Sequence, residues 1–281
     1  MMPPSPRGAD LHVHTLHSDG LYTPETLVAT AVERLLRAVA VTDHDTVAGV
    51  TPCRQAAEGT GLEVVAGVEF GSPHGFNEIH IVGLFVDVEN PALRTAVARI
   101  LEERKGRTLE SVRRLGRLGK HVSASQLFES AAPAAPGRAH VARALVESGG
   151  APSLRAAFQR YLANGMPAHV PRSYPTFQQA IEVIHQAGGV AVYAHPQLTN
   201  EDRLIPEMVE AGLDAIEVRH PCHPGNVEER YRALCANHGL LPSGGTDCHG
   251  HGQGLMGVAR ISDEELEALR AAALRRAAKE T

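Results

Sequence analysis

Tryptophan is absent from the 281 residues of this chain, and aromatic residues of all kinds make up only 4%. Because hydrophobic residues still account for 43%, we expect a core built from aliphatic side chains. The four cysteines lack the spacing of a zinc ribbon or a disulfide framework, so neither device is expected to hold the fold together. They favour a protein of the reducing cytoplasm.

Long apolar runs and strong positive charge are missing as well. No stretch reaches the roughly 18 apolar residues of a membrane span, and the proline-rich residues 1–8 lack the apolar region of a signal peptide. The formal net charge of −5 argues against a strongly basic surface, and so against stable binding of duplex nucleic acid. It leaves room for a short nucleotide held by metals and a few arginines. Neither a Gly-x-Gly-x-x-Gly nor a Walker A segment offers the usual phosphate cradle.

What the chain does have is a run of metal-binding side chains near its start. His12 and His14 stand two residues apart in a predicted strand, so both side chains point to the same face and can reach one ion. The turn sequence Ser18-Asp19-Gly20 follows, which places Asp19 in the loop beyond that strand. The alternative for this segment alone is a strand with two incidental histidines.

Further short apolar runs lead into metal-binding side chains in the same way. Since the ends of parallel strands and the loops after them form one face of an α/β fold, we expect these side chains to converge. Imidazole and carboxylate ligands without thiolates suit manganese, iron or zinc, and their number predicts a polynuclear centre. The candidate ligands at these positions are His12, His14, Asp19, Asp43, His44, Asp45, Glu69, His80, His195, Asp247 and His249.

Strands and helices alternate along most of the chain. The pattern predicts strands over 10–14, 38–42, 63–69, 78–85, 190–195, 214–219 and 241–246. These strands suit an α/β fold, a distorted seven-stranded (β/α) barrel, with a doubly wound open sheet as the alternative. The predicted helices include 24–36 with Thr23 as N-cap, 46–58, 91–118, and 262–279 with Ser262 and Glu265 as a capping box.

The middle of the chain lacks strand alternation. From about residue 123 to residue 162 it is predicted to form several short helices separated by prolines and glycines. We therefore assign the barrel to residues 8–98 and 169–281, and a helical insertion that caps the substrate site to residues 99–168.

The order of these segments resembles the PHP family, named for polymerase and histidinol phosphatase. The segments that carry the resemblance are His12-x-His14 with Ser18-Asp19-Gly20, Thr42-Asp43-His44-Asp45, Gly67-Val68-Glu69, His80, Ala194-His195-Pro196 and Gly245-Thr246-Asp247-x-His249. Within that family the chain looks most like the stand-alone phosphoesterases that act on nucleoside 3′,5′-bisphosphates and on short RNA 5′ ends. Gly137-Arg138-x-His140 and Glu217-Val-x-His220-Pro-x-His223 suggest this narrower resemblance.

The resemblance implies two to three divalent metal ions per chain, manganese first, with iron or zinc as alternatives. It also implies which candidates are the predicted ligands and how they would share three ions. His12, His14, Glu69 and Asp247 would hold the first. Glu69, His80 and His195 would hold the second, and Asp19, His44 and His249 the third.

Other residues are candidates for catalysis and substrate binding. His220 and His223 follow the strand that ends at Arg219, and either imidazole suits a general acid; the alternative is ordinary loop histidines. Arg138 and His140 lie at the start of a predicted helix in the insertion, where guanidinium and helix N-terminus suit a phosphate. Arg172 is a further candidate, and for both arginines the alternative is a solvated surface position.

These features together favour hydrolysis of a phosphate monoester of a small nucleotide by a hydroxide that the metals generate. The substrate expected first is a nucleoside 3′,5′-bisphosphate, converted to a nucleoside 5′-monophosphate and phosphate, and 5′-phosphorylated short RNA comes second. Histidinol-phosphate phosphatase is one alternative. An amidohydrolase-type metallohydrolase is another, although no lysine ends a predicted strand, and a non-catalytic metal-bound module is the third. The sequence leaves the oligomeric state open.

Overall fold

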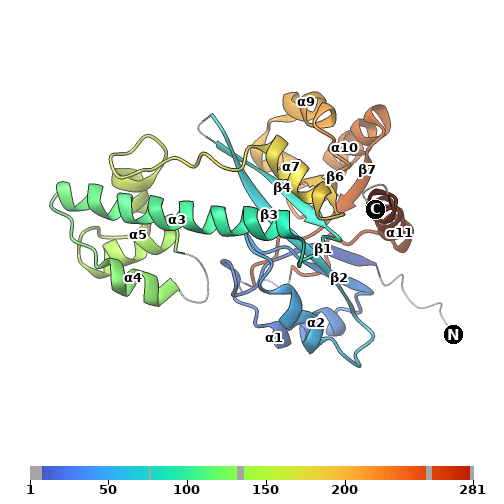
Figure 1. The fold of residues 1–281 in the computed structure, drawn as a ribbon, viewed down its shortest axis with the longest axis horizontal. Coiled ribbons are helices and arrows are strands. Elements are labelled where there is room, and N and C mark those ends of the chain that lie inside the picture. Colours follow the sequence, from blue (N-terminus) through green and yellow to red (C-terminus); the bar gives the residue numbers. More distant parts are fainter. Residues whose placement is uncertain (1–7, 76, 132–135, 251–254, 279–281) are drawn as a thin grey trace.

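A computed structural model describes residues 8–75, 77–131, 136–250 and 255–278 of the chain. Its centre is a seven-stranded sheet in which the strands lie side by side in sequence order (Figure 1). The predicted strands are all present. Their bounds are β1 (Ala9–Val13), β2 (Ala38–Val41), β3 (Glu63–His74), β4 (Asn77–Leu84), β5 (Val190–Tyr193), β6 (Ala215–Arg219) and β7 (Leu241–Gly244).

The sheet curls so that its two edges approach each other. Hydrogen bonds join Ala9 to Ile261 in both directions (N···O 3.1 and 2.9 Å), and the N–H of His14 donates to the carbonyl of Cys248 (3.1 Å). All neighbouring strands run parallel except at β4, which is antiparallel to both β3 and β5. The fold is therefore a distorted, partly closed α/β barrel, as predicted, and not a doubly wound open sheet.

Strand β3 corrects one sequence prediction. The strand expected to end at Glu69 continues to His74, because residues 67–74 pair with residues 77–84 of the antiparallel strand β4. Glu69 thus lies in the middle of a strand. The same pairing sets Gly71 opposite His80, which brings a second predicted ligand close to Glu69.

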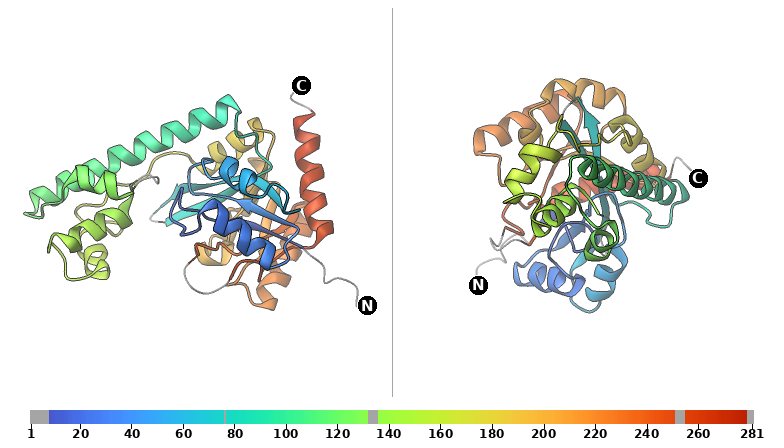
Figure 2. Two further views of the ribbon diagram at one scale, coloured as in Figure 1. Left: turned by 90° about the horizontal axis from the view of Figure 1, so that it is seen from below. Right: turned by 90° about the vertical axis from the view of Figure 1, so that its left-hand side faces the viewer.

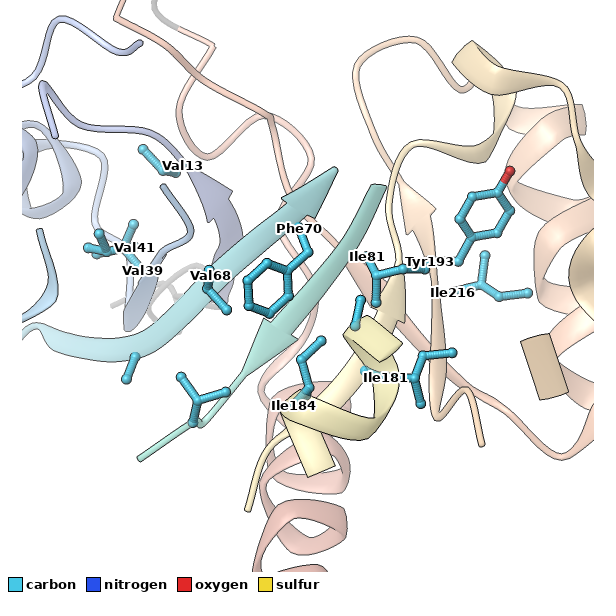
Figure 3. Close-up of a cluster of buried hydrophobic side chains, with 14 of the residues drawn as sticks. Val13, Val39, Val41, Val68, Phe70, Ile81, Ile181, Ile184, Tyr193 and Ile216 are labelled. Atoms are coloured by element: carbon cyan, nitrogen blue, oxygen red, sulfur yellow. The ribbon is translucent and has the colours of Figure 1, made fainter. Parts of the chain in front are cut away.

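Side chains of opposite faces of the sheet enter two different cores. In β2, Val39 and Val41 pack into the larger core, whereas Ala38 and Ala40 pack into a smaller core on the other face. Figure 3 shows part of the larger core, in which Ile181 and Ile184 of helix α7 (Phe177–Gln186) lie against strands β3 to β5. The smaller core is closed by Leu266, Leu269 and Ala273 of helix α11 (Asp263–Ala277).

The helices follow the predicted pattern with shifts at their ends. The helix expected over 46–58 begins only at Val50, because Asp45 adopts a positive φ of 59° and the chain after it forms a loop. The bounds are α1 (Pro24–Glu33), α2 (Val50–Ala56), α3 (Pro91–Arg117), α4 (Ala124–Ala131), α5 (Arg138–Glu147), α6 (Leu154–Ala157), η1 (Phe158–Leu162), α7 (Phe177–Gln186), α8 (Pro196–Thr199), η2 (Asp202–Leu204), α9 (Ile205–Glu210), α10 (Gly225–His238) and α11 (Asp263–Ala277).

A group of helices from α3 to η1 projects from the sheet (Figures 1 and 2). It has a core of its own, which includes Leu115, Leu127 and Leu145. The first half of α3 belongs instead to the larger barrel core, through Leu93 and Ile100. The boundaries 99–168 stay a prediction for this insertion. In the part of the chain described, no helix is long and apolar enough to cross a membrane.

Candidate metal centre

The buried carboxylate of Glu69 lies at the centre of a cluster of imidazoles. Its Oε2 atom faces His12 Nε2 (3.3 Å), His14 Nε2 (3.3 Å) and His44 Nδ1 (2.9 Å). Its Oε1 atom faces His80 Nδ1 (2.8 Å) and His195 Nε2 (3.1 Å). One carboxylate thus presents each of its oxygens to a different group of ligand nitrogens. This geometry suits a carboxylate that bridges two ions.

The first set of donors consists of His12, His14, Glu69 and Asp247. One ligand atom from each lies within 4.8 Å of the others. His12 Nε2, His14 Nε2, Glu69 Oε2 and Asp247 Oδ1 are all buried and have no hydrogen-bond partner. A buried polar atom normally has a partner, so four such atoms that converge on one point fit a divalent cation.

A second set surrounds the other oxygen of Glu69. His80 and His195 both contact Oε1, as the resemblance implies for the second ion. His44, Glu69 and His80 also offer ligand atoms within 4.8 Å of one another. His44 therefore lies between two sets of donors and not beside the third set alone.

The third set gathers His14, Asp19, His44 and His249 within 4.8 Å. The closest pair is His249 Nε2 and Asp19 Oδ1, at 3.2 Å. Asp19 comes from the loop after β1, and His249 follows β7 at the opposite edge of the curled sheet. The structure thus brings all the predicted ligands together, although their share among individual ions stays a prediction.

The charges of this cluster stabilise each other. Burial alone would lower the pKa of His14, but the carboxylates of Asp247 and Glu69, 3.0 and 3.3 Å from Nε2, outweigh burial and raise it to about 10. Burial opposes ionisation of Asp19 too, yet His249 and His44 hold the pKa of its carboxyl well below the usual range. Metal ions at this site would take the place of the imidazole protons beside the carboxylates.

Two buried carboxylates that sequence reasoning left without a role support these ligands. Glu217 of β6 accepts a hydrogen bond from the His195 backbone N–H (2.6 Å), and its other oxygen contacts His12 Nδ1 (3.2 Å). Asp10 accepts from the Thr246 N–H and hydroxyl (2.9 and 2.6 Å), which fixes the segment that carries Asp247. An acidic residue inside an apolar strand was the signal that both residues offered.

Asp43 and Asp45 flank His44 in the chain. Asp43 accepts hydrogen bonds from the Thr15 N–H and hydroxyl (both 2.7 Å) and from the Ser18 hydroxyl (2.7 Å). Asp45 binds the guanidinium of Arg172. Both aspartates therefore fix loops around the centre.

A cavity adjoins the metal centre on the side of the helical insertion. It is bounded by the predicted ligands Asp19, His44 and His80 and by several arginines. These arginines are Arg104 and Arg107 of α3, Arg138 of α5, and Arg172. Arg104 and Arg107 were not among the candidates, because a polar helix with many charges gave no sign of which charges face a ligand.

The arginines differ in how far their charge is already neutralised. Arg172 is bound to Asp45 and to the carbonyl of Gly71. Arg138 donates to Asn164 (2.8 Å) and lies 3.5 Å from Glu78. Nε of Arg107 lies 3.6 Å from Glu103 Oε1 but is buried without a hydrogen bond, and burial and the nearby Arg172 lower the pKa of Arg107 to about 10. The surroundings of Arg107 thus favour an additional negative charge.

The remaining candidates lie at other points around the centre. His140 accepts a hydrogen bond from the Gly137 N–H (3.3 Å) and is not among the described residues that line the arginine cavity. His220 and His223 follow β6 and are both buried. The ring of His220 lies 5.8 Å from that of His195. Burial lowers the pKa of His220 to about 4 and also lowers that of His223, so both imidazoles are neutral at pH 7.

Comparison with known proteins places this geometry in a family. The protein-family model of the PHP domain matches residues 10–229 of the sequence. The 5′-3′ exoribonuclease Rnm of Escherichia coli is 39% identical over 250 residues, which cover 85% of this chain and 84% of the relative. A 3′,5′-nucleoside bisphosphate phosphatase of Chromobacterium violaceum is 34% identical over 264 residues, which cover 90% of this chain and 91% of the relative. A solved structure from Bifidobacterium adolescentis, described as a metal-dependent phosphoesterase, superposes with a TM-score of 0.82 at 30% identity, over 96% of this chain and 98% of that one.

The donor set and the comparisons agree on the class of protein. Buried imidazoles and carboxylates converge as metal ligands do, and both the relatives and the similar structure cover most of the chain. The chain is therefore a metal-dependent phosphoesterase and belongs to the PHP domain family.

Proposed function

We propose that the enzyme hydrolyses a phosphate monoester of a small nucleotide, and that a nucleoside 3′,5′-bisphosphate is the preferred substrate. The products are a nucleoside 5′-monophosphate and phosphate. The observation that carries this proposal is a single cavity whose lining includes both predicted metal ligands and arginines. A ligand with two phosphates can place one phosphate at the metal ligands and the other at the arginines. The names of the two relatives, a nucleoside bisphosphate phosphatase and an exoribonuclease, support a nucleotide substrate.

Divalent ions, with manganese expected first, would be held by the donors around Glu69. When bound, they would lower the pKa of a water molecule and neutralise phosphate oxygens. The chain itself supplies the position of those donors. Glu217 fixes His12 and the backbone of His195, and Asp10 fixes the segment that leads to Asp247.

The second phosphate is proposed to bind at Arg107 and Arg138. Guanidinium groups bind phosphate through paired hydrogen bonds, and Arg107 and Arg138 both line the cavity. Arg172 is proposed to line the same site, while its contacts with Asp45 and Gly71 hold the cavity wall in place. His140 near the start of α5 is proposed to support the anion site from outside the cavity, through its hydrogen bond with Gly137, which lines the cavity.

His220 and His223 are proposed to act at the leaving group. Nδ1 of His220 accepts the N–H of Cys222 (3.2 Å), which assigns the proton of the neutral ring to Nε2. This Nε2 atom is buried without a partner in the protein. A neutral His220 would therefore act as a hydrogen-bond donor to the departing oxygen, and not as an imidazolium.

A second candidate substrate is short RNA with a 5′-phosphate. The observation in its favour is a second hollow that shares Glu78 and Arg172 with the arginine cavity and continues past Pro73 and His169. A ligand longer than one nucleotide has room to continue there.

The test compares phosphate release from several substrates with manganese present. Adenosine 3′,5′-bisphosphate is expected to have a higher kcat/KM than histidinol phosphate or an aryl phosphate. Adenosine 3′-phosphate, which lacks the second phosphate, should lose part of that advantage, because remote binding energy supports the reacting centre. If histidinol phosphate is the best substrate, the nucleotide proposal is wrong. Hydrolysis of amides but not of phosphate esters would favour the amidohydrolase alternative.

A further inference from the structure

The loop after β6 carries a second group of potential ligands, outside the donors around Glu69. His220, Cys222 and His223 each offer one ligand atom within 4.8 Å of the others. Both histidines are more than nine-tenths buried, with exposed fractions of 7% and 5%. The backbone forms a turn here, in which the His223 N–H donates to the His220 carbonyl (2.9 Å). This turn brings the two imidazoles to the same side of the loop.

The hydrogen bonds of the histidines leave donor atoms free. Nδ1 of His223 donates to the carbonyl of Val218 (2.8 Å), so the lone pair of the neutral ring is on Nε2. Nε2 of His223 is buried and has no partner. Nε2 of His220 is also buried without a partner, and it can bind an ion once the ring proton moves from Nε2 to Nδ1, which faces Cys222 Sγ. A buried polar atom normally has a hydrogen-bond partner. Two of them in one turn therefore point to a ligand.

Cys222 adds a donor of a different kind. Its Sγ lies 2.8 Å from Nδ1 of His220. The residue is half-buried, so part of it remains exposed to solvent.

We propose that His220, Cys222 and His223 form a separate binding site for a thiophilic divalent cation of the zinc class. One thiolate and two imidazoles are typical zinc ligands, and three protein ligands leave a fourth position open. Binding would release the proton of the Cys222 thiol to solvent. The donors around Glu69 are imidazoles and carboxylates alone, which suit harder ions, so the two sites differ in the ions that they prefer.

The site has a consequence for the proposed role of His220. An ion at this site would occupy His220, only 5.8 Å from the ring of His195, and the imidazole could not then serve the leaving group. Zinc-class ions in excess would therefore inhibit the enzyme. Binding itself rests on the three side chains and not on the proposed substrate.

Titration of the manganese-loaded enzyme with Cd²⁺ tests the site directly. Cadmium bound to a thiolate gives an ultraviolet charge-transfer band, whereas cadmium bound to imidazole and carboxylate does not. The wild type should develop the band and saturate at about one ion per chain, in line with a single thiolate in the ligand set. The variant Cys222→Ser should lose it, and His223→Gln should need more Cd²⁺ to reach it.

Cys248→Ala is the matched control, because Cys248 is buried between the predicted ligands Asp247 and His249. It should keep the band. Melting curves of each variant show whether it is folded. The proposal is wrong if the wild type gives no band, or if the band survives Cys222→Ser and disappears in Cys248→Ala. Neither result depends on phosphatase activity, so failure of this site is distinct from failure of the proposed function.

Discussion

At the scale of single residues, the position of Glu69 explains why this centre needs so much support. The carboxylate is completely buried and meets imidazoles from several elements of the barrel. Burial would raise its pKa, but His44, His80 and His12 hold it well below the usual range. A buried carboxylate of this kind is stable only if its partner side chains are held at contact distance. Residues behind the ligands should therefore affect metal binding nearly as much as the ligands do.

Glu217→Gln should weaken metal binding without removing a ligand. The amide keeps the size of the side chain but loses the charge that faces His12 Nδ1 and the His195 N–H. Loss of a group that orients a ligand typically costs roughly 10- to 100-fold in metal affinity. Competition with a chelator measures that affinity, and activity should recover when metal is added in excess.

The reference variants are His14→Ala, which removes a ligand, and His121→Ala, which removes an exposed histidine. Metal content by elemental analysis should fall in the first and stay unchanged in the second. Unchanged metal affinity in Glu217→Gln would contradict the role of Glu217, and wild-type metal content in His14→Ala would contradict the ligand assignment.

Arg138→Ala should weaken substrate binding and leave the metals in place. The guanidinium lines the arginine cavity, and a charge-assisted contact with phosphate is worth about 1.5–3 kcal/mol, or ten- to a hundred-fold in kcat/KM. Kinetics with adenosine 3′,5′-bisphosphate and metal analysis check both parts. Arg143→Ala, an exposed position on the same helix, should behave as wild type. An unchanged kcat/KM in Arg138→Ala would return Arg138 to a solvated surface role.

At the scale of elements, helix α3 connects the two parts of the active site, which are the predicted metal ligands and the arginines of the cavity. The first half of this 27-residue helix packs into the barrel core, and Leu115 near its end packs into the core of the insertion. Between them, Arg104 and Arg107 face the cavity, and the Thr108 hydroxyl donates to the carbonyl of Pro136 (3.1 Å). The helix therefore sets the distance between the arginines and the metal ligands. Loss of packing in the insertion should then change substrate binding.

Leu145→Ala tests this connection. Leu145 of α5 is completely buried in the core of the insertion, and such a truncation costs about 2–5 kcal/mol. We expect faster hydrogen exchange in α4 and α5 and a higher KM, with unchanged metal content. Leu154→Ala on α6 is the control, because that side chain is 49% exposed. A raised KM in both variants, or in neither, would contradict the link between packing in the insertion and substrate binding.

The sequence was sufficient where a signal is local. The capping box of Ser262 and Glu265 and the N-cap of Thr23 predicted helix starts that the structure confirms. It was not sufficient where the partner is distant. The extension of β3 past Glu69 depends on antiparallel pairing with β4, and Arg107 lines a cavity together with Gly137 and Arg172, which are distant in the sequence. No periodicity within a segment carries such information.

At the scale of the whole molecule, positive charge is concentrated in spite of a net charge of −5. Arginines gather at one cavity, whereas the chain as a whole has more acidic than basic residues. A small anion can enter the cavity and be attracted there, while the net charge gives a long polyanion no overall attraction to the protein. This distribution supports the proposal of a mononucleotide or short oligonucleotide in preference to a duplex.

A half-buried charge away from the metal centre joins distant parts of the chain. Asp214, just before β6, faces His185 Nε2 of α7 (2.8 Å), accepts the Ala191 N–H of β5 (2.9 Å) and pairs with Arg276 of α11. Burial opposes its ionisation, but His185 and the Ala191 N–H lower the pKa of the carboxyl below its usual value. Its ionised form thus stabilises the contact between three elements of the barrel.

Asp214→Asn should therefore reduce stability in a pH-dependent way. Because the pKa is lower in the folded than in the unfolded state, the stabilisation is complete above the unfolded value of about 4 and is lost as the pH falls through the folded value. Urea unfolding of the metal-free protein at pH 7 should show a loss of roughly 1.5–3 kcal/mol, the range for hydrogen bonds to charged groups. The difference in unfolding free energy between Asp214→Asn and the wild type should become steadily smaller as the pH falls below 4. Glu89→Gln breaks only the exposed pair with Arg94. It should change the unfolding free energy by less than about 0.5 kcal/mol both at pH 7 and below pH 4. A loss in Asp214→Asn that persists at low pH would mean that packing, and not the charge of Asp214, stabilises this junction.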